Sequence, residues 1–309
     1  MALLNPAGTA ATPPDRGVAP GPRVLLSARE DQLDSVLALA RVAAHLGDLR
    51  RTGCSDLEPP PAAALICDDS AATERLLALG VPVVHLRSGS DAPSAEETPT
   101  GRALVRTHRP GWLPGSPSRG ARPTGVLAPR RAGRSPARAG TLVLLSLWRV
   151  PADEAGAFTS GALRELADAS LRRTGSCTVV ADTGLGLVRS ALAGRQGVRV
   201  VRAADADTDA LHAGADVFLA SPVLGALALA QARRAPLALL PPLGPAQRTL
   251  AAQVAEVLPL PSVDDPGDPA LWSPPLAAGP WHLLDSALDD LRGAQRVART
   301  LRQLALAPL

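Results

Sequence analysis

The sequence has few or none of several residue types, and each shortage narrows what the protein can be. Its 309 residues include no lysine and no tyrosine, two phenylalanines and four tryptophans. A chain without lysine cannot form the phosphate-binding loop of P-loop ATPases, which needs that side chain. The three cysteines, Cys54, Cys67 and Cys177, are far apart, which favours free thiols over disulfides. No Cys or His spacing matches a zinc site, so we expect no metal.

Long apolar runs are also missing. The longest uncharged apolar run, 217–232, has 16 residues and contains Pro222 and Gln231, whereas a helix that crosses a bilayer needs roughly 20. Residues 1–21 lack the basic start and apolar core of a secretion signal. We therefore expect a disordered leader over 1–21, no membrane span and a cytoplasmic protein.

The sequence does contain a regular alternation of short apolar runs and helical segments. Expected strands are 23–27, 63–67, 81–86, 141–147, 177–181, 198–201, 215–220 and 236–240. In the first expected helix, Leu33, Val36, Leu37, Ala40 and Ala44 share one face. Continuous apolar strands that alternate with helices are typical of parallel sheets covered on both faces. A single core rarely exceeds about 250–300 residues, so two domains are expected.

The pattern predicts an α/β fold with two Rossmann-like parallel-sheet domains that face a cleft. The smaller N-terminal domain spans 22–98, a linker rich in Arg, Pro and Gly spans 99–139, and the C-terminal domain spans 140–309. A stripe of Leu and Val residues over 281–304 predicts a long terminal helix, which could lie back across the other domain.

Positive charge is concentrated in the middle of the chain. Between Thr98 and Ala152 there are ten arginines and no acidic residue. One interpretation is a positively lined region that attracts an anion such as a nucleoside diphosphate or RNA. The other is a solvated, proline-rich linker. Because almost no aromatic residues lie among these arginines, we do not expect nucleic acid as a partner.

Polar residues that follow the expected strands are the candidates for a binding site. In open parallel sheets a ligand binds beyond the carboxyl ends of the strands, where helix N-termini can hold phosphate. In the C-terminal half this rule selects Ser146, Arg149, Asp182, Thr183, Arg202, Ser221, Gly225, Gln247 and Arg248. In the N-terminal half it selects three carboxylates that could act as a base: Asp31, Asp68 and Asp69. Asp69 could instead cap the helix that follows it.

Residues 211–256, LHAGADVFLASPVLGALALAQARRAPLALLPPLGPAQRTLAAQVAE, resemble the donor-binding half of GT-B glycosyltransferases. Within that superfamily the chain is similar to bacterial proteins related to cytosylglucuronate (CGA) synthase, which joins glucuronate from UDP-glucuronate to cytosine. The resemblance implies a nucleotide sugar as substrate, a small acceptor such as a nucleobase or natural product, and no separate cofactor. It places Gln247 against the hydroxyls of the donor sugar.

The sequence departs from typical GT-B glycosyltransferases at two functional positions. The family's ribose-binding Glu is replaced by Leu229, and the Gly-Gly-His after the first strand is replaced by residues 28–31, Ala-Arg-Glu-Asp. Several alternatives therefore remain: a catalytically silent homologue that acts as a partner or activator of another protein, an epimerase or hydrolase of nucleotide sugars with the same fold, or a nucleotide-binding module.

Overall fold

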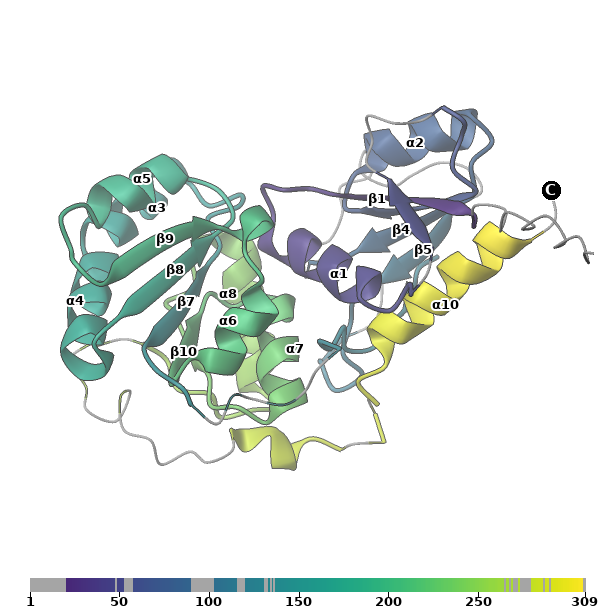
Figure 1. The fold of residues 1–309 in the computed structure, drawn as a ribbon. Coiled ribbons are helices and arrows are strands. Elements are labelled where there is room, and N and C mark those ends of the chain that lie inside the picture. Colours follow the sequence, from purple (N-terminus) through teal and green to yellow (C-terminus); the bar gives the residue numbers. More distant parts are fainter. Residues whose placement is uncertain are drawn as a thin grey trace, which may run out of the picture.

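The computed structural model describes most of the chain. The described residues are 21–47, 49–52, 58–89, 103–115, 120–130, 133, 135, 137–263, 265–266, 268, 272, 279–285, 287–288 and 290–307. The expected leader, Cys54 and part of the expected linker lie outside them. The described chain forms two lobes, each built on a parallel sheet (Figure 1).

The N-terminal sheet has six strands in the order β2-β1-β3-β4-β5-β6, and all neighbours are parallel. Its strands are β1 (Arg23–Ala28), β2 (Arg50–Thr52), β3 (Ala63–Cys67), β4 (Val83–Arg87), β5 (Leu104–Thr107) and β6 (Arg122–Pro123). Every residue of β3 and β4 is buried, as expected for central strands. Helix α2 (Ser70–Ala78) covers one face, and α1 (Leu33–Ala43) covers the other.

Strands β5 and β6 come from the segment that the sequence analysis assigned to a linker. They pair beside β4, and the buried residues Trp112, Leu113 and Leu127 lie in the same stretch. The described part of 99–139 is therefore integrated into the fold. A strand as short as β5, with the sequence LVRT, has no clear periodicity, so only its pairing with β4 reveals it.

The C-terminal sheet has five parallel strands in the order β11-β10-β7-β8-β9. They are β7 (Thr141–Leu145), β8 (Cys177–Ala181), β9 (Val198–Arg202), β10 (Val217–Ala220) and β11 (Ala238–Leu239). Alternate residues of β7 enter opposite cores. One core includes α3 (Ala152–Ser160), α4 (Ala162–Thr174) and α5 (Leu185–Ala191). The other includes α6 (Thr208–Gly214), α7 (Leu224–Arg233) and α8 (Gly244–Ala255). The expectation of two parallel-sheet α/β domains is confirmed.

The C-terminal helix returns to the N-terminal domain. The expected helix over 281–304 is shorter: a 3-10 turn, η3, covers Pro280–Leu283, and the helix α10 covers Gly293–Leu306. Figure 1 shows α10, in yellow, running along the lobe that contains β1, β4 and β5. Val297 and Leu301 of α10 are buried in the same core as α1 and β3. The return across the other domain is thus confirmed.

Candidate functional site

Four of the predicted residues meet at the carboxyl edge of the C-terminal sheet. Ser146 follows β7, and its hydroxyl donates to Asp182, which follows β8, at 2.6 Å. The Ser146 N–H donates to the hydroxyl of Ser221, which follows β10, at 3.0 Å. Gln247, in the first turns of α8, donates its side-chain amide to the Ser146 carbonyl at 2.8 Å. The rule for parallel sheets brings these residues together, and their polar atoms bond to one another.

Asp182 is the centre of this cluster. Its carboxylate accepts hydrogen bonds from the N–H groups of Leu147 at 2.9 Å and Thr183 at 2.7 Å. It also accepts from the N–H of Leu33, at the start of α1 in the other domain, at 3.1 Å. Burial raises the pKa of Asp182, and these hydrogen bonds oppose the rise. Asp182 therefore joins the first turn of α1 to the C-terminal sheet.

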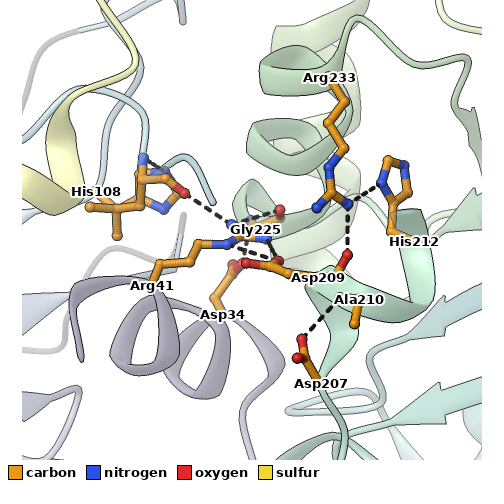
Figure 2. A network of polar contacts seen from close by, with 10 residues as sticks. Asp34, Arg41, His108, Asp207, Asp209, Ala210, His212, Gly225 and Arg233 are labelled. Atoms are coloured by element: carbon orange, nitrogen blue, oxygen red, sulfur yellow. Dashed lines mark hydrogen bonds and ion pairs between the residues drawn. The ribbon is translucent and has the colours of Figure 1, made fainter. Parts of the chain in front are cut away.

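The N-terminus of α7 carries an acidic group from the other domain. Asp34 of α1 accepts from the N–H of Gly225 at 2.6 Å (Figure 2). It also accepts from the N–H of Leu224 at 3.3 Å. Asp34 is only 6% exposed, and burial raises its pKa to about 7, with a further upward contribution from the charge of Asp68. A helix N-terminus is a natural anion site because its first N–H groups lack helical partners. Here a carboxylate of the chain fills that site.

Arg41 anchors the other end of α1 to the same helix. Its guanidinium donates to the carbonyl of Gly225 at 3.0 Å, to the carbonyl of Leu127 at 3.1 Å and to the carboxylate of Asp209 at 3.2 Å (Figure 2). The side chain is 1% exposed. Asp209 in turn accepts from Arg233 through its carbonyl, at 2.7 Å. A buried Arg needs such a set of acceptors, and α7 and α6 supply part of it.

The three candidate bases differ in environment. Asp68 is half-buried and accepts from the N–H of Ser88 at 2.9 Å and from the Ser88 hydroxyl. Burial raises the pKa of Asp68 to about 6. Asp69 caps α2 by accepting from the N–H of Ala72 at 2.8 Å. Asp31 is half exposed and pairs with Arg29 at 3.0 Å, and this contact lowers its pKa. Of the three candidates, Asp68 is the one whose pKa is raised toward neutrality.

Each of the three predicted arginines contacts a neighbouring side chain. Arg149 has a φ of 56° and its guanidinium lies 4.4 Å from the centre of the Trp148 ring. Arg202 pairs with Glu30 of the other domain at 2.9 Å.

Arg248 pairs with Glu154 at 2.7 Å. The same Glu154 oxygen accepts from the N–H of Gly244, where α8 begins, at 3.1 Å. A second helix N-terminus at this edge therefore also carries a carboxylate from the chain.

The space between these groups is small. A hollow of about 30 Å³ is lined by Gln32, Asp34, Gly89, Ser146, Trp148, Pro222, Val223, Ala246 and Gln247. A water molecule occupies roughly 30 Å³ in the liquid, whereas ligand pockets measure roughly 300–1,000 Å³. A cavity of about 460 Å³ lies elsewhere, between α6 and the amino ends of β7 and β8. The hollow that these described residues line is too small for a nucleotide sugar in this conformation.

Sequence reasoning missed Asp34 and Arg41, although both carry a signal. Arg41 lies on the stripe of Leu33 and Leu37, at helical spacing, so a charged residue occupies an apolar face. The structure buries Leu37, Asp34 and Arg41 but leaves Ala40 exposed. A charged residue on a buried stripe indicates a polar partner across the interface. The sequence does not say which residue that partner is.

The described residues show two further absences. They contain no group of three or more His, Cys, Asp or Glu side chains placed to hold a metal ion. None of the helices in this part of the chain is long and apolar enough to cross a membrane.

Comparisons with known proteins place this geometry in context. No curated protein matches the chain by sequence. Among solved structures, the spinosyn rhamnosyltransferase SpnG with thymidine diphosphate is similar at 14% identity and a TM-score of 0.45, over 92% of this chain and 98% of that one. The glycotransferase of kitacinnamycin is similar at 13% identity and a TM-score of 0.49, over 91% and 99%. MurG of Acinetobacter baumannii is similar at 10% identity and a TM-score of 0.45, over 92% and 100%.

A family model described as "CGA synthase-related protein" matches residues 24–309, which include both domains and the returning helix α10. The chain therefore belongs to the CGA synthase-related family.

Proposed function

We propose that this protein binds a nucleotide sugar between its two domains and transfers the sugar to a small acceptor, such as a nucleobase or natural product. Membership of the CGA synthase-related family over residues 24–309 supports this class of reaction. UDP-glucuronate is the first donor to test, and cytosine is the first acceptor. The nucleotide sugar is the substrate, and the proposal needs no separate cofactor.

One observation carries the proposal: polar groups from both sheets converge on a single place. Asp34 and Asp68 belong to the N-terminal domain, and Ser146, Asp182 and Gln247 belong to the other. Asp34 and Asp68 are close enough for the charge of Asp68 to raise the pKa of Asp34. Buried carboxylates with a raised pKa are unusual outside functional sites. A nucleotide sugar would reach these groups when the domains separate.

Each proposed role follows from the chemistry of the side chain. Asp68 is the proposed general base, because a pKa of about 6 leaves it ionised yet basic at neutral pH. Arg149 and the N–H groups of α7 would stabilise the departing diphosphate. Gln247 would face the sugar hydroxyls. The reaction would be a direct displacement at the anomeric carbon, in which the acceptor proton passes to the base.

Ligand binding and turnover test the proposal separately. Thermal unfolding with UDP, dTDP and GDP should show a rise in melting temperature for one of them, since a ligand at 100 times its Kd adds about 2.7 kcal/mol of stability. With a donor and an acceptor, Asp68→Asn should lower kcat by about 10²-fold or more. Asp216→Asn, which removes an exposed charge that pairs with Arg138, is the matched control. No binding of any nucleotide would contradict the proposal.

A second candidate, a catalytically silent homologue that acts on a partner protein, is favoured by a specific observation. Asp34 fills the N-terminus of α7. By the resemblance, Leu229 stands where typical GT-B glycosyltransferases have a ribose-binding Glu. A silent homologue would show no nucleotide-dependent stabilisation and no release of nucleoside diphosphate. It would instead change the activity of a transferase added to it.

A further inference from the structure

Helix α1 is attached to the C-terminal domain along its whole length. Its first N–H, that of Leu33, donates to Asp182. Its first turn places Asp34 against α7, and its last turn places Arg41 against α7 and α6. Figure 1 shows α1 lying between the two lobes. These contacts are buried and polar, which distinguishes them from ordinary packing between covering helices.

Two side chains of α1 hold the same residue of α7. Asp34 accepts from the N–H of Gly225, and Arg41 donates to its carbonyl (Figure 2). The two side chains are about two helical turns apart on α1, so they reach Gly225 from the same face. A Cβ on Gly225 would lie 2.6 Å from Cδ1 of Leu37 and 2.9 Å from the carboxylate of Asp34. The absence of a side chain at Gly225 lets the two helices approach this closely.

An outside anion would need the N–H groups that Asp34 now holds. The N–H groups of Leu224 and Gly225 lie in the first turn of α7, where N–H groups lack helical partners, and both donate to the Asp34 carboxylate. A phosphate oxygen that accepted from these two N–H groups would need the position that the Asp34 carboxyl group occupies. The ionised form of Asp34 would also repel the phosphate, because little water is present there. The anion and Asp34 therefore exclude each other.

We propose that α1 is a built-in clasp, in which Asp34 takes the place of an anion at the N-terminus of α7 and Arg41 locks the two domains shut. Binding at α7 requires α1 to withdraw. The identity of the anion as a donor diphosphate rests on the proposed function above. The clasp itself depends only on contacts within the chain.

Amide hydrogen exchange tests the clasp without any ligand. In Asp34→Ala, the amides of Leu224 and Gly225 lose their acceptor and should exchange faster. The decisive amide is that of Leu33, which bonds to Asp182 and not to Asp34. If α1 withdraws as a unit, exchange at Leu33 should rise at least tenfold. Asp207→Ala, which removes a carboxylate cap from α6, is the matched control and should leave Leu33 unchanged.

Binding of UDP, measured by calorimetry, tests the competition. Asp34→Ala and the milder Asp34→Asn should bind UDP at least tenfold more tightly than the unaltered chain. If the exchange rate of the Leu33 amide is unchanged in both variants, the clasp is overturned, whatever the UDP affinities are. Equal UDP affinity in all chains would overturn the competition while leaving the donor site intact. Faster Leu33 exchange without UDP binding in any chain would support the clasp and refute the donor site.

Discussion

Replacement of Arg41 by alanine is the sharpest test of how the two domains are held together. The change removes the guanidinium that donates to the Leu127 carbonyl, the Gly225 carbonyl and the Asp209 carboxylate. It leaves those acceptors beside a space where the side chain was fully buried. We expect the free energy of unfolding to fall by about 3–5 kcal/mol, the range for breaking a buried ion pair from one side.

The structure allows that magnitude to be divided into parts. A buried carbonyl that loses its donor costs about 1–3 kcal/mol, and here two carbonyls are affected. The Asp209 side chain is 26% exposed, so water can partly solvate its charge after the change. The carbonyls and the lost packing of the Arg41 stem therefore carry more of the cost than the unpaired charge. Arg41→Lys should lower the free energy of unfolding by less than Arg41→Ala does, but it should still lower it, because an ammonium cannot reproduce the fixed fork of donors of a guanidinium.

Urea unfolding followed by circular dichroism measures this difference. Arg195→Ala is the control, since Arg195 makes a similar pair with Asp168 at 2.7 Å but at the surface, where the Asp168 side chain is 43% exposed. Exposed pairs contribute about 0–1 kcal/mol. If Arg41→Ala cost no more than Arg195→Ala, the inference that Arg41 is a principal attachment between the domains would be wrong.

Three other outcomes are expected. In thermal unfolding, Gly225→Ala should destabilise the fold by about 1–3 kcal/mol through overpacking against Leu37 and Asp34. Gly186→Ala in α5, which has open space around it, is the control and should be neutral or stabilising. Gln247→Ala should cost about 1–3 kcal/mol in urea unfolding, because the Leu243 N–H and the Ser146 carbonyl lose their partner. Burial lowers the pKa of His108 to about 3. Between about pH 6.5 and 3 the unfolded chain therefore binds a proton that the folded chain does not. As the pH drops through this range, His108 lowers the free energy of unfolding by up to about 1.4 kcal/mol per pH unit. His108→Asn should flatten this fall, and an unchanged slope would contradict the buried, neutral imidazole.

The elements that the sequence predicted best are those with strong local patterns. The runs 63–67 and 141–147 contain the central strands β3 and β7, since a continuous apolar run is buried wherever it lies in a parallel sheet. Strand β5 was not predicted, because its four residues have no strand pattern of their own and it forms by pairing with β4. The sequence predicted a terminal helix, but the predicted helix started at 281, whereas α10 starts at Gly293.

In the candidate site, too, the features that follow from local patterns were predicted and those that depend on domain docking were not. The positions of Ser146, Asp182, Ser221 and Gln247 follow from one rule about the ends of parallel strands, and their mutual bonds agree with that rule. That Asp34 reaches α7 depends on how two domains dock, and periodicity along one helix gives the buried face without naming the partner. The catalytic and donor-binding roles assigned to all the predicted site residues remain predictions.

The return of α10 has a consequence for how the chain is made. Val297 and Leu301 complete a core whose other members, on α1 and β3, are synthesised near the start. Until α10 is synthesised, these early residues expose the apolar surface that α10 later covers. The core of the N-terminal domain therefore cannot be completed until the residues of α10 have been synthesised. A fragment that stops before Gly293 would leave that surface permanently bare.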